Sequence, residues 1–137
     1  MTRINTVEPS ELLDQHLLAE LREMVRLPKN LHISLNRASK PFSEVEIPRQ
    51  YVLGSGHVKF FYNKFKWLEN RFLSLLVESD KRGFNINFRD ATIFRNVPTK
   101  YYNDWEATKD SLELNRNRLQ ERIEAKPDFY RYYGSKL

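Results

Sequence analysis

The sequence predicts an all-α fold, a single compact domain of three main helices with long irregular loops. Apolar residues recur at intervals of three and four in three stretches of the chain, which is typical of helices with one buried face. No segment shows the alternation of apolar and polar residues that predicts a half-buried strand. A chain of 137 residues suits one domain, which we expect to span residues 1–137.

The first predicted helix runs from about Glu11 to Leu27. Ser10 resembles a helix cap, and acidic residues follow it in the first turn. We expect Pro28 to end this helix, because proline fits poorly in a helix interior. Five apolar residues share an arc of about 120° that should face the core: Leu17, Leu18, Leu21, Met24 and Val25.

Residues 28–56 are predicted to form a long irregular connection, and connections of this length are usually functional. Gly54-Ser55-Gly56 closes it and would allow a sharp turn or the close approach of a ligand. The second helix is expected over about 57–80, and Lys81-Arg82-Gly83 fits its C-terminal cap. Its buried stripe consists of Phe61, Phe65, Leu68, Phe72, Leu75 and Leu76.

Residues 84–105 are again predicted to be irregular. The third helix should span about Trp105 to Ala125, and Pro127 should end it. Its predicted inward residues are Leu112, Leu119 and Ile123. The tail that follows, 128–134, is rich in aromatic residues and carries one base.

The composition excludes several kinds of site. The chain has no cysteine, which excludes disulfides, thiolate metal sites and a cysteine nucleophile. The three histidines stand at unrelated spacings, so we expect no metal site and no cofactor. No run approaches the roughly 20 apolar residues of a membrane span, and the N-terminus does not resemble a secretory signal. We therefore expect a cytoplasmic monomer that does not bind membranes.

The net charge of +5 is a weak indication of nucleic-acid binding. The bases lie in patches; residues 81–100, for example, hold five bases and one acidic residue. Several bases on one face would bind phosphates, because affinity grows with each counterion released. An ordinary solvated surface explains the same charge pattern equally well.

The polar arc of the first helix is the most informative feature of the sequence. It contains Gln15, His16, Ala19, Glu20, Arg22, Glu23 and Arg26. Glu23 stands among two arginines and a histidine on a face that we expect to be exposed. The alternative is a solvated face with ion pairs, each of which contributes only about 0.3–0.5 kcal/mol. On the third helix, Arg118 and Arg122 could likewise bind two phosphates or simply be solvated. His16 by itself fits a surface or capping histidine equally well.

Several short motifs, in order along the chain, carry a resemblance to a known family. The first are Thr2-Arg3-Ile4-Asn5, Asp14-Gln15-His16-Leu17, and Glu20-Leu21-Arg22-Glu23 with Arg26. The later ones are Leu53-Gly54-Ser55-Gly56-His57-Val58, Phe60-Phe61-Tyr62, Arg82-Gly83-Phe84-Asn85-Ile86 and Tyr130-Arg131-Tyr132-Tyr133-Gly134. Together they resemble the phage endonuclease V family of pyrimidine-dimer DNA glycosylases.

This resemblance implies a bifunctional DNA N-glycosylase and AP lyase that excises pyrimidine dimers, or a related damaged base, from double-stranded DNA. It implies that the nucleophile is the α-amine of Thr2, exposed by removal of Met1, and that the catalytic carboxylate is Glu23. An imine forms and β-elimination then nicks the strand. DNA and phosphate contacts would come from Arg3, Gln15, His16, Arg22, Arg26, Arg118 and Arg122. The lesion or duplex would also touch Tyr130, Tyr132 and Tyr133, and a phage-encoded enzyme would act in the host cytoplasm.

The sequence departs from the family pattern at three positions. Leu21 stands where an aromatic residue is expected, Val25 where proline is expected and Phe129 where tryptophan is expected. These changes leave the pairing of Thr2 with Glu23 intact but bear on lesion preference. Two alternatives therefore stay open: a catalytically weak relative that binds distorted duplex, and a helical interaction protein with no nucleic-acid role.

Overall fold

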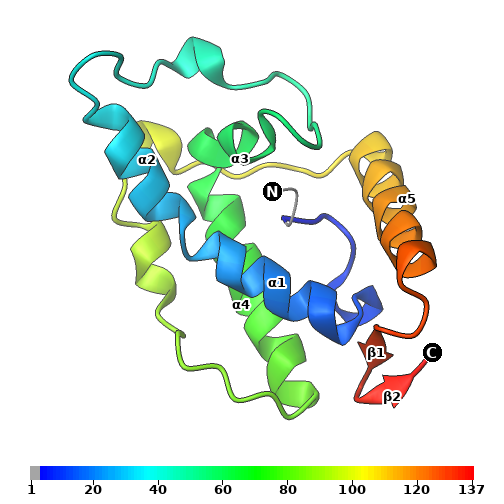
Figure 1. The fold of residues 1–137 in the computed structure, drawn as a ribbon. Coiled ribbons are helices and arrows are strands. Elements are labelled where there is room, and N and C mark those ends of the chain that lie inside the picture. The colour runs from blue at the N-terminus through cyan, green and yellow to red at the C-terminus, as the bar shows by residue number, and fades with distance from the viewer. Residues whose placement is uncertain (1–3) are drawn as a thin grey trace.

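Helices of very different lengths make up most of the computed structural model, which describes residues 4–137 (Figure 1). The α-helices are α1 (Asp14–Met24), α2 (Leu27–Leu35), α3 (His57–Phe60), α4 (Phe65–Lys81) and α5 (Lys109–Ala125). Short 3₁₀ turns occupy Pro9–Glu11, Glu44–Glu46, Phe61–Asn63, Ala91–Phe94 and Thr99–Tyr101. The strands β1 (Arg131–Tyr132) and β2 (Ser135–Lys136) pair antiparallel, with Arg131 opposite Lys136 and Tyr132 opposite Ser135. The predicted all-α class is confirmed.

The core forms around α4, which α1 crosses in Figure 1. The buried face of α4 is the stripe that the sequence predicts, from Phe65 to Leu76. Leu17, Leu21 and Met24 of α1 pack into the same cluster of buried residues, and Leu18 and Val25 are partly buried at its edge. The cluster continues from Ile4 to Tyr101, so one core serves the whole fold.

The prediction of one helix over 11–27 is wrong. Ser10 lies within a 3₁₀ turn, and α1 begins only at Asp14, where no side chain caps it. Pro28 does not end a helix either, because it stands in the first turn of α2, where a missing amide hydrogen costs nothing. The connection 28–56 is therefore helical at its start.

The second predicted helix is interrupted. Its first turns form α3 and a 3₁₀ turn, and α4 begins after Lys64, whose φ of −131° is not helical. Gly56 precedes α3 with a φ of 84°, and a Cβ there would lie 3.2 Å from Pro48 Cγ. The C-terminal prediction is confirmed, since Gly83 follows α4 with a φ of 79°.

The third helix begins four residues later than predicted, at Lys109, because the Thr108 side chain accepts a hydrogen bond from the Ser111 amide and caps it. Its predicted inward residues are only partly buried. The fully buried residues of α5 are polar: Ser111 and Asn115. The inner face of α5 therefore combines two leucines at the edge of the core, Leu112 and Leu119, with polar residues that contact a polar partner.

That partner is the N-terminal arm, which we define as residues 4–8 and which runs between α1 and α5 in Figure 1. The Ile4 amide donates to His57 Nε2 at 3.2 Å, and the Ile4 carbonyl accepts from the Tyr51 hydroxyl at 2.9 Å. Asn115 Nδ2 donates to Thr6 Oγ1 at 2.7 Å. Hydrogen bonds from two sides therefore fix the path of the arm.

A buried ion pair joins the arm to α1 and α4. Arg71 of α4 donates from Nε and Nη2 to the Glu20 carboxylate of α1 at 2.7 and 2.9 Å, and from Nη1 to the Val7 carbonyl at 2.6 Å. The Asn5 amide also donates to Glu20. Burial raises the pKa of the Glu20 carboxyl, and the positive charge of Arg71 opposes that rise.

The C-terminal clasp, which we define as residues 129–134, closes the other end of α1. Tyr133 and Gly134 have positive φ angles and form a tight turn, whose two amides donate to the Asp14 carboxylate at 3.1 and 2.8 Å. Arg82 donates to the same carboxylate at 2.9 Å and lies against the rings of Tyr132 and Tyr133. The clasp thus connects the start of α1 to the end of α4.

Replacing Arg71 with methionine should lower the free energy of unfolding by about 3–5 kcal/mol, because it leaves the Glu20 carboxyl buried without its partner. Urea unfolding followed by circular dichroism measures this change. Arg89→Met is the matched control, since the Arg89–Asp80 pair is half exposed and its loss should leave the unfolding midpoint almost unchanged. Equal midpoints for the two variants would contradict the importance of the buried pair.

Candidate functional site

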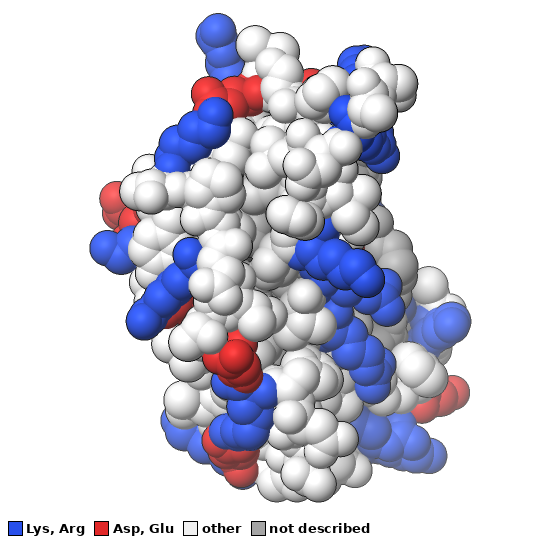
Figure 2. Space-filling model, turned by 90° about the vertical axis from the view of Figure 1, so that its left-hand side faces the viewer, with Lys and Arg blue, Asp and Glu red and all other residues white. Residues whose placement is uncertain are grey.

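A basic surface covers the C-terminal half of α1 and continues onto α2. Residues 22–40 hold five bases and one acidic residue, Glu23. Arg22 and Arg26 are exposed and Glu23 is half-buried. Figure 2 shows Lys and Arg side chains gathered along the right-hand side of that view, with few acidic side chains between them. A surface of this kind favours a polyanion.

The solvated ion-pair alternative for this face is not what the structure contains. Among residues 4–137, neither Arg22 nor Arg26 takes part in a salt bridge with Glu23 or with any other carboxylate. Glu20, which could have paired with a neighbouring arginine on α1, binds Arg71 instead. The two arginines are therefore available to an anionic ligand.

The prediction that His16 and Glu20 belong to the exposed face is wrong, because they are 6% and 0% exposed. Their side of α1 is covered by the N-terminal arm and by the C-terminal clasp. The His16 ring lies 4.5 Å from the ring of Tyr130, and Gln15 binds the backbone of Phe129 and Arg131. Arg22 and Arg26 are exposed as predicted, whereas Gln15, Ala19 and Glu23 are half-buried.

The two predicted arginines of α5 lie on the side of that helix facing the arm. Both are half-buried, and Arg118 also forms a 3.5 Å ion pair with Glu121. Burial raises the pKa of Tyr51, and the charge of Arg118 opposes that rise. Burial lowers the pKa of His57, and the charge of Arg122 adds to that effect. These contributions are smaller than the effect of burial, and they indicate that Arg118 lies near Tyr51 and Arg122 near His57.

The arm connects these elements to Glu23. The Asn5 amide meets α1 at Glu20, and Glu23 follows three residues later, about 4.5 Å farther along the helix axis and on a similar side. The arm meets α5 at Asn115, one turn before Arg118. Thr2 and Arg3, which the sequence places in the site, lie outside the described residues.

A model of the family described as pyrimidine dimer DNA glycosylase matches residues 1–92. The chain belongs to this glycosylase family, the endonuclease V family. It is therefore a DNA glycosylase of DNA repair, and its substrate is DNA. The match contains the predicted site residues from Thr2 to Arg26, whereas Arg118, Arg122 and the C-terminal tyrosines lie beyond it.

The C-terminal tyrosines of the glycosylase all have partners within the chain. The Tyr130 ring is buried against His16. The Tyr132 hydroxyl donates to the Ser10 carbonyl at 2.9 Å, and the Tyr133 hydroxyl donates to Glu78 at 2.6 Å. Their contact with a lesion stays a prediction, and the structure gives them a second role in holding the clasp.

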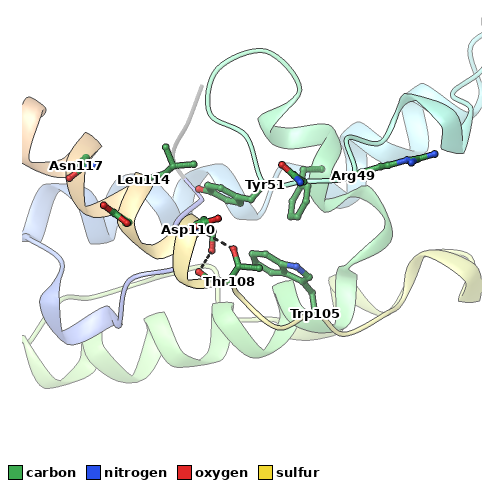
Figure 3. A pocket seen from close by; sticks show the side chains of 11 residues that line it. Arg49, Tyr51, Trp105, Thr108, Asp110, Leu114 and Asn117 are labelled. Atoms are coloured by element: carbon green, nitrogen blue, oxygen red, sulfur yellow. Dashed lines mark hydrogen bonds between the residues drawn. The ribbon is translucent and has the colours of Figure 1, made fainter.

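Sequence reasoning gave no role to four side chains that hold the arm: Tyr51, His57, Arg71 and Asn115. Tyr51 also lines a cavity of about 540 Å³ with Trp105 and the outer face of α5. Figure 3 shows Asp110, Leu114 and Asn117 reaching this cavity from α5. The lining holds one base, Arg49, and two acidic residues, Asp110 and Glu113, so its charge does not favour a phosphate there.

Two kinds of feature do not occur in the described part of the glycosylase. No helix within residues 4–137 is long and apolar enough to cross a membrane. The same residues contain no group of three His, Asp or Glu side chains that could hold a metal ion.

The glycosylase should lose stability in mild acid through His57. Its folded pKa lies below the ordinary value of 6.5, so the stabilisation is complete above that value and is lost as the pH falls through it toward the folded pKa. The free energy of unfolding should therefore fall more steeply from pH 7.5 to 5.5 in the wild type than in His57→Gln. Urea titrations at several pH values test this, and parallel curves would contradict it.

Proposed function

We propose that this DNA glycosylase is bifunctional: it excises pyrimidine dimers, or a related damaged base, from duplex DNA and then cleaves the abasic strand as an AP lyase. The nucleophile is the α-amine of Thr2 after removal of Met1, and the catalytic carboxylate is Glu23. Residues 1–137 act as one glycosylase/AP-lyase domain.

The anchored arm is the observation that carries this proposal. Hydrogen bonds fix Ile4 on both sides, and Asn5 binds α1 one turn before Glu23. Thr2 is two residues from Ile4, and two residues of extended chain span at most about 7 Å. This short reach supports the pairing of the Thr2 amine with Glu23.

An α-amine suits the first chemical step. Its ordinary pKa is about 7.7–8.0, so roughly a tenth of it is neutral and nucleophilic at pH 7. Its lone pair attacks C1′ of the damaged nucleotide, the bond from C1′ to the base breaks, and the base leaves with the bonding electrons and takes up a proton. Opening of the sugar ring then gives an imine between Thr2 and C1′.

Glu23 and the arginines serve the remaining steps. A carboxylate beside the sugar stabilises the positive charge that develops as the base departs. It then removes a proton from C2′, and the electrons of that bond expel the 3′ phosphate and cleave the strand. Arg22 and Arg26 bind the flanking phosphates and hold the sugar within reach, assisted by Arg3, Arg118 and Arg122. Access to the sugar requires the nucleotide to turn out of the stack.

Borohydride should trap the wild-type protein covalently on a duplex that contains an abasic site or a pyrimidine dimer, because it reduces the imine to a stable amine. Glu23→Gln should reduce strand nicking by at least about 100-fold while duplex binding changes little, since the amide cannot accept the C2′ proton. Denaturing gels measure trapping and nicking, and mass spectrometry confirms that Met1 is absent.

The outcomes separate the alternatives. Absence of trapping by a protein that lacks Met1 would overturn the amine mechanism. Base release without trapping would indicate a glycosylase that does not act as a lyase. Tight binding to distorted duplex without either reaction, unchanged in Glu23→Gln, would favour the catalytically weak relative.

Arg22→Gln and Arg26→Gln should each weaken binding to undamaged duplex and reduce the slope of log K against log salt concentration by about 1, because each removes one phosphate contact. Fluorescence anisotropy from 50 to 200 mM salt measures the slope. Arg89→Gln is the control, since its guanidinium already pairs with Asp80. An unchanged slope in both the Arg22 and the Arg26 variant would place the phosphates elsewhere.

A further inference from the structure

His57 is a buried polar side chain outside the set of residues to which the mechanism assigns a role. It is 1% exposed and makes two hydrogen bonds to backbone. Nε2 accepts from the Ile4 amide at 3.2 Å, which requires the proton to be on Nδ1, and Nδ1 donates to the Val52 carbonyl at 2.9 Å. The rings of Tyr51 and Phe61 pack edge-on against the imidazole, with centroids 5.5 and 5.6 Å away.

These contacts give the imidazole one orientation and one tautomer. A neutral histidine suits this position, because one ring nitrogen accepts a hydrogen bond while the other donates one, and the rigid ring fixes the distance between them. Protonation would replace the acceptor with a second donor facing the Ile4 amide. The buried surroundings and the neighbouring charge of Arg122 both favour the neutral form.

The segment before α3 is built to present this ring. Gly56, with its φ of 84°, turns the chain immediately before His57, and a side chain at position 56 would press on Pro48. The Tyr51 hydroxyl, from the same segment, shares its single proton between the Ile4 carbonyl at 2.9 Å and Asn115 Oδ1 at 2.8 Å. The Ile4 amide and the Ile4 carbonyl are therefore both hydrogen-bonded by side chains of one segment, residues 48–57. These two bonds fix the position of the arm at Ile4.

We propose that His57 is the positioning residue of the N-terminal arm: by holding the Ile4 amide it sets where the Thr2 amine meets the sugar. This inference rests on the proposed amine mechanism. His57 does not touch the substrate and acts through Ile4, two residues from the nucleophile. Displacement of a nucleophile by about 1 Å can cost up to about 100-fold in rate, so the anchor should govern the chemical step more than DNA affinity.

The test compares single-turnover imine trapping at saturating abasic duplex in four variants. His57→Leu removes the acceptor and should slow trapping about 10- to 100-fold, with less than about a twofold change in the Kd for duplex. His57→Gln keeps an amide oxygen that can accept from Ile4 and should recover part of the rate. Tyr51→Phe removes the second anchor and should slow trapping by a smaller factor. Arg89→Gln, whose guanidinium pairs with Asp80 rather than with the arm and which lies outside residues 22–40, is the control and should match wild type.

A second measurement does not depend on activity. In the wild type the Ile4 amide should be protected from hydrogen exchange, and in His57→Leu it should exchange at least about tenfold faster while amides of α4 keep their protection. If His57→Leu does not fold, His57→Gln and Tyr51→Phe decide the matter by the same two measurements.

The possible failures are distinguishable. If the wild type traps and the folded His57 and Tyr51 variants trap at the same rate, the positioning role is overturned and the amine mechanism stands. If rate losses in the variants only follow losses in duplex affinity or in the fraction folded, His57 is structural and the inference is also overturned. If the wild type without Met1 does not trap, the proposed function falls and this inference falls with it.

Discussion

A single guanidinium, that of Arg71, connects the three parts of the molecule on which the site depends. It binds the Glu20 carboxylate of α1 through two nitrogens and the Val7 carbonyl of the arm through the third. A buried ion pair loses much of its Coulomb energy to desolvation, so a pair of this kind contributes little net stability unless every polar atom is satisfied. Here the Asn5 amide supplies a further hydrogen bond to Glu20. The network gives the arm a defined position against α1 rather than simply adding stability.

The elements that periodicity specifies were predictable from the sequence. The stripe from Phe65 to Leu76 and the end of α4 at Gly83 follow from apolar spacing and from glycine geometry. The break at Lys64 was not predictable, because apolar residues continue at helical spacing on both sides of it. The prediction for Pro28 is wrong because proline occurs both just after the end of a helix and in the first turn of one. Its presence alone does not distinguish these two positions.

The candidate site also has a part that the sequence predicts and a part that it does not. Periodicity places Arg22, Glu23 and Arg26 on one exposed turn. It also placed Glu20 there, because the partner that buries Glu20 is 51 residues away in the sequence. The functions of Tyr51, His57 and Asn115 depend on contacts between distant segments, which the spacing of residues within one helix does not reveal. The contact of the aromatic tail with a lesion or duplex stays a prediction, and its packing of two rings against the Arg82 guanidinium could not be read from the sequence.

The C-terminal clasp has a consequence for how the molecule reaches its folded state. The Asp14 carboxylate, at the start of α1, binds the Gly134 amide across 120 residues of chain. Contacts of such large sequence separation form late, since the loop between them must first be closed. During synthesis, α1 and α4 can emerge from the ribosome and collapse together well before residues 133 and 134 exist. Until residues 133 and 134 have joined the fold, the Asp14 carboxylate lacks their two amide donors, so the start of α1 gains its final contacts last.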